Sequence, residues 1–137
     1  MHVYNIFISH SWEYSSDYQN LIDLLNQDPY FHFKDYSVTE DDPLLIYNKE
    51  YYKSELRNKI TNQMKPCSVI LIPAGVYASN SDSIAMEIEI AKQLEKPIVG
   101  ILKWGAEKSS TIVQENATKI VKWNSSSIIA AIKEVAI

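Results

Sequence analysis

A chain of 137 residues with a hydrophobic fraction of 46% is long enough to bury the core of one domain. Its net charge of −4 and its singly scattered lysines argue against nucleic-acid binding, which usually needs a basic patch. No apolar run reaches the roughly 18 residues of a membrane span, so we expect no membrane partner. The single cysteine, Cys67, excludes an internal disulfide framework and lies in an apolar run, where we expect it to be buried. The first residues lack the features of a secretion signal, so a cytoplasmic location is expected.

Short apolar runs alternate with segments of helical periodicity along the chain. The predicted strands are 3–9, 30–36, 67–73, 97–102 and 119–123, and the predicted helices are 15–26, 49–64, 82–95, 110–116 and 125–135, the last with a serine-rich cap. Because strands and helices alternate, we predict a flavodoxin-like three-layer α/β/α fold. Its five-stranded parallel sheet has the order 2-1-3-4-5, and one domain spans residues 1–137.

One carboxylate interrupts the apolar face of the helix predicted over residues 82–95. Winding this segment at roughly 100° per residue places Glu87 between Ile84, Ala91 and Leu94. Glu89 falls on the opposite, solvated face. An ionised carboxylate is costly to bury, so Glu87 is expected to form an ion pair with a neighbouring helix, to edge a pocket, or to serve chemistry.

Two loops meet where a ligand would bind such a sheet. With the order 2-1-3-4-5, the strand order reverses between the first and third strands, and ligands bind beyond the carboxyl ends there. The first loop contains Ser9, His10 and Trp12, and the second contains Tyr77. Their hydroxyls, imidazole and aromatic rings suit a ligand with ribose hydroxyls and a flat base. Glu87 lies near the start of the helix that leaves the second loop, so its carboxylate can face the same crevice.

Several nucleotide-binding and signalling classes are excluded by missing motifs. The chain has three glycines in all and contains neither a GxxxxGK[ST] loop nor a GxGxxG after the first strand, which argues against a P-loop NTPase and a dinucleotide oxidoreductase. A phospho-receiver would need acidic residues after the first strand and at the end of the third. Ser9-His10 and Pro73-Ala74 occupy those places. His2 and His32 stand alone, so no metal site is predicted.

A set of motifs in a specific order spans nearly the whole chain. They are Phe7-Ile8-Ser9-His10-Ser11-Trp12, Phe33-Lys34-Asp35-Tyr36-Ser37, Asp42-Pro43-Leu44, Ser68-Val69-Ile70-Leu71, Gly75-Val76-Tyr77, Glu87-Ile88-Glu89-Ile90-Ala91, Lys96-Pro97-Ile98-Val99-Gly100-Ile101, Trp104-Gly105 and Trp123-Asn124. Together they resemble the prokaryotic TIR-like family that includes the TIR protein of the Thoeris anti-phage system. The resemblance implies a TIR-like fold of the flavodoxin type. In active members it also implies cleavage of NAD⁺ at the nicotinamide–ribose bond by a glutamate on the helix after the third strand.

By position that glutamate is Glu87 and not Glu89. Active TIR domains often carry Trp four residues earlier, at the wall of the nicotinamide–ribose site, where this chain has Ser83. NAD⁺ would be the substrate, with no separate cofactor. The product implied by the resemblance is a cyclic or conjugated ADP-ribose that diffuses to and activates an effector protein in antiviral defence. Self-association into a homo-oligomer is left open.

The mechanism expected from these residues centres on positive charge at the ribose. Departure of nicotinamide leaves an oxocarbenium-like ribose, which Glu87 would stabilise while holding ribose hydroxyls. Further roles are expected for a larger set: Ser9 and His10 at the ribose and phosphates, Phe7 or Trp12 against a base, and Asp35 and Ser37 at the end of the second strand. Exclusion of water would favour attack by adenine or another nucleophile over hydrolysis.

Two other functions fit the same residues. The chain could be a non-enzymatic TIR-like module that signals by self-association or binds a nucleotide unchanged. It could also be a nucleoside deoxyribosyltransferase-like enzyme, a class that shares the sheet order and a nucleophilic Glu. Insensitivity of function to Glu87→Gln would indicate the first, and base exchange on deoxynucleosides would indicate the second.

Overall fold

Five parallel strands form one sheet in the computed structural model, which describes residues 2–9, 17–37, 49–74, 82–102 and 111–137. The elements in chain order are β1 (Val3–Ile8), α1 (Asp17–Asn26), β2 (His32–Asp35), α2 (Lys49–Met64), β3 (Val69–Pro73), α3 (Asp82–Gln93), β4 (Ile98–Leu102), α4 (Thr111–Asn116), β5 (Lys119–Lys122) and α5 (Ser125–Val135). The sheet order is β2-β1-β3-β4-β5 and every pairing is parallel. The predicted α/β/α architecture and strand order are confirmed.

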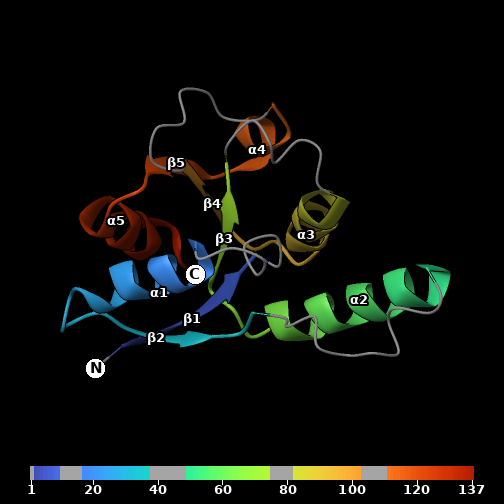
Figure 1. The fold of residues 1–137 in the computed structure, drawn as a ribbon, viewed down its shortest axis with the longest axis horizontal. Helices are drawn as coiled ribbons and strands as arrows, with labels where there is room; N and C mark the ends of the chain where they lie inside the picture. The colour runs from blue at the N-terminus through green and yellow to red at the C-terminus, as the bar shows by residue number, and fades with distance from the viewer. Residues whose placement is uncertain (1, 10–16, 38–48, 75–81, 103–110) are drawn as a thin grey trace.

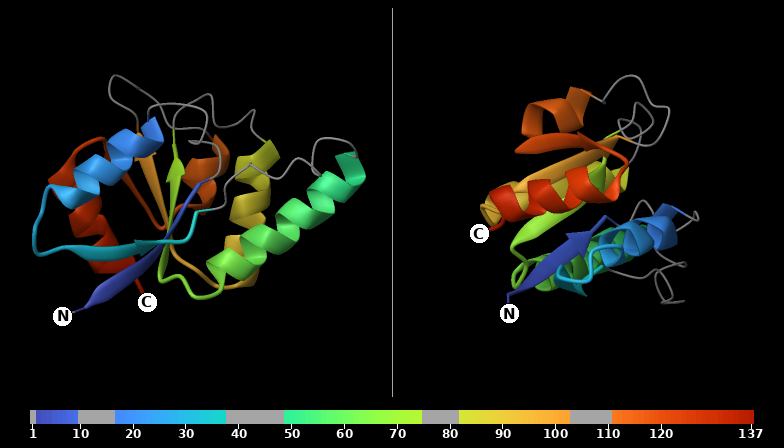
Figure 2. Two further views of the ribbon diagram at one scale, coloured as in Figure 1. Left: turned by 60° about the horizontal axis from the view of Figure 1, so that its bottom comes forward. Right: turned by 90° about the vertical axis from the view of Figure 1, so that its left-hand side faces the viewer.

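Helices cover both faces of the sheet, α1 and α5 on one side and α2, α3 and α4 on the other (Figures 1 and 2). Two apolar cores result. The α3-side core packs strand residues such as Phe7 and Ile70 against α2, α3 and α4. The α5-side core packs the alternate strand residues, such as Ile6 and Leu71, against α1 and α5. Successive side chains of a strand point to opposite faces of the sheet, and both faces are covered here. Consecutive residues of β1 are therefore apolar, and its last three residues are all fully buried.

Two local expectations are wrong at the ends of elements. The second strand was expected to begin at Tyr30, which instead lies in a turn with its side chain 87% exposed. Asp28 stabilises that turn: its Oδ1 accepts from the Tyr30 N–H at 2.9 Å and its carbonyl accepts from the Phe31 N–H at 3.1 Å. At the other end of the chain, Asn124 and not a serine is the N-cap of α5, accepting from the Ser127 N–H at 2.8 Å.

The remaining boundaries agree with the prediction to within two residues in the described part of the chain, and α2 and α5 agree at both ends. Cys67 is buried as expected, with 2% of its surface exposed. Burial raises the pKa of its thiol from 9.0 to about 12. None of the helices in the described ranges is long and apolar enough to cross a membrane.

Candidate functional site

The strand order reverses between β1 and β3. The chain leaves β1 to form α1 on one face of the sheet and leaves β3 to form α3 on the other face. Connections that diverge in this way open a crevice beyond the carboxyl ends of the two strands. This edge of the sheet is where the sequence predicts a ligand.

Glu87 lies within the apolar face of α3, as the helical periodicity predicts. Its side chain is 0% exposed, and Ile84 and Ala91, one turn before and after it, are also 0% exposed. A carboxylate in this setting has lost its hydration shell, so its interactions with nearby charges and dipoles are stronger than in water. Such an environment suits a group that stabilises charge developing on a substrate.

Glu89 has a different environment, although it is only two residues away. Its side chain is 55% exposed and pairs with Arg57 of α2, the single arginine of the chain. The two guanidinium nitrogens reach the two carboxylate oxygens at 3.4 and 3.2 Å. Glu89 is therefore a surface carboxylate whose exposed ion pair links α3 to α2. Solvent screening limits the contribution of such pairs to stability.

Ser9, which directly follows β1 at the carboxyl edge of the sheet, is the second fully buried polar residue among those described. Among the described residues, Ser9 and Glu87 are the polar side chains with 0% exposure. The Ser9 N–H donates to the Leu71 carbonyl at 2.9 Å, so the ladder between β1 and β3 continues through this residue. Alternation along the strand puts its side chain on the same face as Phe7, the face that α3 covers. Ser9 and Glu87 therefore share the α3 side of the sheet.

Phe7 occupies the α3-side core and has 0% of its surface exposed. Its ring packs against apolar side chains and offers no open face on which a base could stack in this structure. Phe7 and Trp12 were the two residues expected to stack on a base, so Trp12 is left as the candidate for this role. Trp12 lies outside the described residues, as do His10, Tyr77 and the side chain of Ser83.

Asp35 and Ser37 come together at the end of β2, on the α1 side of the sheet. The Ser37 N–H donates to Asp35 Oδ1 at 2.8 Å. Tyr18, in the first turn of α1, donates its phenolic hydrogen to Asp35 Oδ2, and its oxygen lies 3.1 Å from Ser37 Oγ. Tyr18 was not among the predicted site residues. Its position near the start of the helix that follows the first strand, and hence at the carboxyl edge of the sheet, is the sequence signal that could have drawn attention to its hydroxyl.

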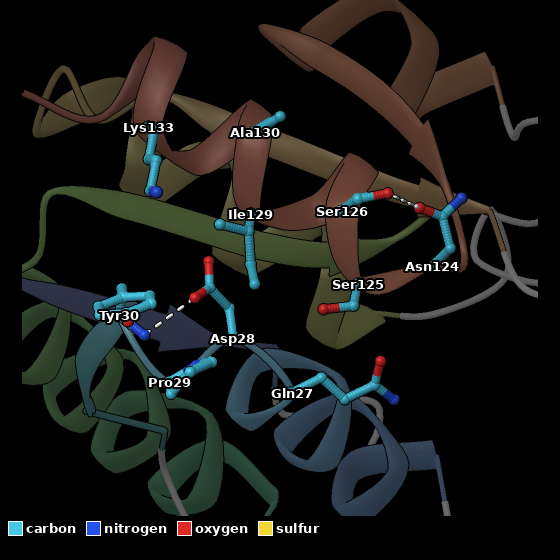
Figure 3. A pocket seen from close by; sticks show the side chains of 10 residues that line it. All are labelled: Gln27, Asp28, Pro29, Tyr30, Asn124, Ser125, Ser126, Ile129, Ala130 and Lys133. Atoms are coloured by element: carbon cyan, nitrogen blue, oxygen red, sulfur yellow. Dashed lines mark hydrogen bonds between the residues drawn. The ribbon is translucent and has the colours of Figure 1, made fainter.

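An open groove lies elsewhere, between the α1–β2 turn and α5 (Figure 3). Its cavity volume is about 810 Å³, and Tyr30, Asn124 and Lys133 are among its lining residues. Ile129, which also lines it, belongs to the α5-side core, so the groove is on the opposite side of the sheet from Glu87. None of the predicted site residues that the structure describes is among those that line it. No cluster of three or more metal-binding side chains occurs in the described ranges.

Comparison with known proteins identifies the family. The model of the TIR-like domain of the Thoeris protein ThsB matches residues 7–108. The chain belongs to this family. The match includes Ser9, Asp35 and Glu87 but ends before β5 and α5, which complete the sheet and cover its α5 side.

Two solved structures are similar to the chain at low sequence identity. The CMP N-glycosidase BcmB from Clostridium botulinum is 13% identical with a TM-score of 0.55, and the match covers 94% of this chain and 98% of that one. The β-glucosidase EmGH1 from Erythrobacter marinus is 17% identical with a TM-score of 0.47, and the match covers 97% of this chain and 24% of that one. The likeness to the N-glycosidase supports the fold. No curated protein sequence matches.

Proposed function

We propose that this TIR-like domain cleaves NAD⁺ at the nicotinamide–ribose bond, with Glu87 as the catalytic residue. The observation that carries the proposal is the full burial of Glu87 within the apolar face of α3, the helix that follows β3, while Glu89 is exposed and paired with Arg57. Membership of the ThsB TIR-like family supports the substrate. The domain would occupy residues 1–137 and act in the cytoplasm.

The chemistry follows from the charge that develops at the ribose. The bond between the anomeric carbon and the nicotinamide nitrogen breaks, and its electron pair leaves with nicotinamide, which becomes neutral. The Glu87 carboxylate accepts hydrogen bonds from ribose hydroxyls and stabilises the oxocarbenium-like transition state. Ser9, on the same side of the sheet, supplies a hydroxyl near the sugar. Attack by adenine closes a cyclic ADP-ribose and attack by water gives ADP-ribose; the product then activates a separate effector protein.

A pyrimidine nucleotide is a second candidate substrate. The solved CMP N-glycosidase is similar over 98% of its length and by its name acts on the same kind of bond, between a base nitrogen and a ribose carbon. The same buried carboxylate could stabilise the ribose in either reaction. CMP therefore belongs beside NAD⁺ in the test.

The test follows the consumption of NAD⁺ and CMP by mass spectrometry with the wild-type chain and two matched variants. Glu87→Gln keeps the shape of the side chain but removes its charge, and should lower NAD⁺ turnover by about 10²–10³-fold. Glu89→Gln makes the same change two residues away and should leave turnover within about twofold of wild type, since it disrupts only an exposed ion pair.

Each result separates the candidates. Equal turnover by the wild type and Glu87→Gln would contradict the assignment of Glu87. Consumption of CMP alone would favour the N-glycosidase reaction. Binding of NAD⁺ without turnover, unaffected by Glu87→Gln, would favour a non-enzymatic signalling module.

A further inference from the structure

Tyr18 joins two parts of the chain that lie at the carboxyl edge of the sheet. It is the second residue of α1, the helix that follows the segment 10–16, in which His10 and Trp12 are predicted to contact the ligand. Through its phenol it contacts Asp35, the last residue of β2, and Ser37, the residue before the segment 38–48. In a parallel sheet with this order, the end of β2 and the start of α1 lie at the same edge as the end of β1.

Ser37 is held from several sides. Its own N–H is bound by Asp35 Oδ1, and the preceding residue, Tyr36, donates its N–H to the Ile6 carbonyl at 2.9 Å. Gln63 of α2 donates its side-chain amide to the Tyr36 carbonyl at 3.2 Å. The backbone is therefore fixed up to the point where the Tyr18 phenol meets the Ser37 hydroxyl. Groups on such a rigid framework keep their orientation when a ligand arrives.

The Asp35 carboxylate keeps acceptor capacity beyond these contacts. An ionised carboxylate has about four lone-pair sites, and its hydrogen bonds with described residues use two, one from Tyr18 and one from Ser37. The side chain is half-buried. Because each oxygen already holds one donor, the direction of the remaining lone pairs is set. A ribose diol supplies the two hydroxyl donors that such a carboxylate can accept.

We infer that Tyr18 is a positioning residue for NAD⁺: it orients Asp35 and Ser37 so that they receive ribose hydroxyls. This inference rests on the proposed function and extends it to a residue on the α1 side of the sheet. Tyr18 acts through Asp35 and takes no part in breaking the glycosidic bond. Its loss should weaken substrate binding and leave the chemical step largely intact.

Tyr18→Phe tests the inference, because it removes the hydroxyl and keeps the ring that packs on the α5-side core. Tyr4→Phe is the matched control: Tyr4 packs on the same core but lies near the amino end of β1. We expect Tyr18→Phe to raise KM for NAD⁺ about tenfold with kcat within about threefold, as for the loss of one hydrogen bond to a charged group. Tyr4→Phe should leave both constants unchanged.

Two further measurements separate positioning from simple structural support. The Kd for NAD⁺, measured by calorimetry in a Glu87→Gln background where turnover is slow, should rise by the same factor in Tyr18→Phe. Asp35→Asn should also raise KM, and the double variant Tyr18→Phe/Asp35→Asn should raise it no further, since Tyr18 acts through Asp35. A lower melting temperature with unchanged KM and Kd would assign Tyr18 a structural role only and overturn the inference.

Failure of the proposed function gives a different pattern. If the wild type binds NAD⁺ but does not consume it, the proposed reaction falls and the Kd comparison still decides the role of Tyr18. If the wild type consumes NAD⁺ and Tyr18→Phe matches it in KM and Kd, only the positioning role falls. If the wild type neither binds nor consumes NAD⁺, both are refuted.

Discussion

The burial of Glu87 predicts an unusual stability for Glu87→Gln. The effective cost of removing an ionised carboxylate from water is several kcal/mol, and a protein recovers part of it through nearby dipoles and charges. Glutamine has the same length and keeps a carbonyl acceptor, but it carries no charge. If the carboxylate is kept for chemistry, removing its charge should raise the free energy of unfolding by about 1–2 kcal/mol, since active-site groups often cost stability.

The opposite sign is expected if Glu87 serves as one half of a buried ion pair. Breaking such a pair by neutralising one partner costs about 3–5 kcal/mol, because the other charge remains buried. For a domain of 137 residues, 1 kcal/mol corresponds to roughly 3–5 °C in Tm. The two explanations therefore predict Tm values for Glu87→Gln that differ by more than about 10 °C, with shifts from the wild type in opposite directions.

Thermal and urea unfolding of the wild type, Glu87→Gln and Glu89→Gln at neutral pH measure the difference. Glu89→Gln provides the reference for an exposed pair, for which a loss of about 0.2–1 kcal/mol is expected. Unfolding should be followed by circular dichroism, with NAD⁺ turnover assayed on the same preparations. A free energy of unfolding for Glu87→Gln that is lower than the wild-type value by about 3 kcal/mol or more would refute this prediction and make Glu87 a structural residue.

Other predictions concern the packing of the sheet and the remaining site residues. A Cβ at Gly100 would lie 2.8 Å from Val113 Cγ1, so Gly100→Ala should cost about 1–3 kcal/mol in unfolding free energy. The double variant Gly100→Ala/Val113→Ala should lose less unfolding free energy than the two single variants lose together, because the smaller side chain relieves the contact. Additive losses would contradict the steric explanation. Burial raises the pKa of the Cys67 thiol, so the folded chain holds this proton more tightly than the unfolded chain does. The resulting contribution to the free energy of unfolding is complete below pH 9.0 and is lost as the pH rises toward about 12. Alkaline unfolding of Cys67→Ala against the wild type checks this, and equal pH dependence would contradict it. Ser9→Ala should keep the N–H bond to β3 and change Tm by only a few degrees, yet lower kcat/KM for NAD⁺ about tenfold or more; unchanged kcat/KM would remove Ser9 from the site.

The fold was predictable because the apolar pattern carries the layer architecture directly. Residues at consecutive positions of β1 are buried on both faces, which only a sheet covered on both sides requires. Helical periodicity likewise separated Glu87 from Glu89 correctly, since positions two apart on a helix point in nearly opposite directions. These signals depend on the local sequence alone.

The errors have the same physical origin: a single hydrogen bond outweighed local propensity. Tyr30 has high strand propensity, but the Asp28 carboxylate binds its N–H and keeps it in a turn. Asn124 caps α5 ahead of three serines because its side-chain oxygen reaches the Ser127 N–H. The contact between the Tyr18 hydroxyl and Asp35 was not predicted for another reason: it spans 17 residues of sequence, which no periodicity reveals.

The point at which β1 turns polar explains how such a site can be rigid. Ile6, Phe7 and Ile8 are buried and apolar, and Ser9, the next residue, is equally buried and polar. The ladder still extends to Ser9, through its N–H bond to Leu71. The change from core to site therefore occurs inside the hydrogen-bonded sheet, before the chain enters the segment 10–16. The hydrogen bond formed during folding thus covers the entropic cost of fixing the Ser9 backbone, and under the proposed function substrate binding does not have to supply it. The proposed reaction needs polar groups that are already in place when positive charge develops on the ribose, and the buried Ser9 and Glu87 meet that requirement for rigidity.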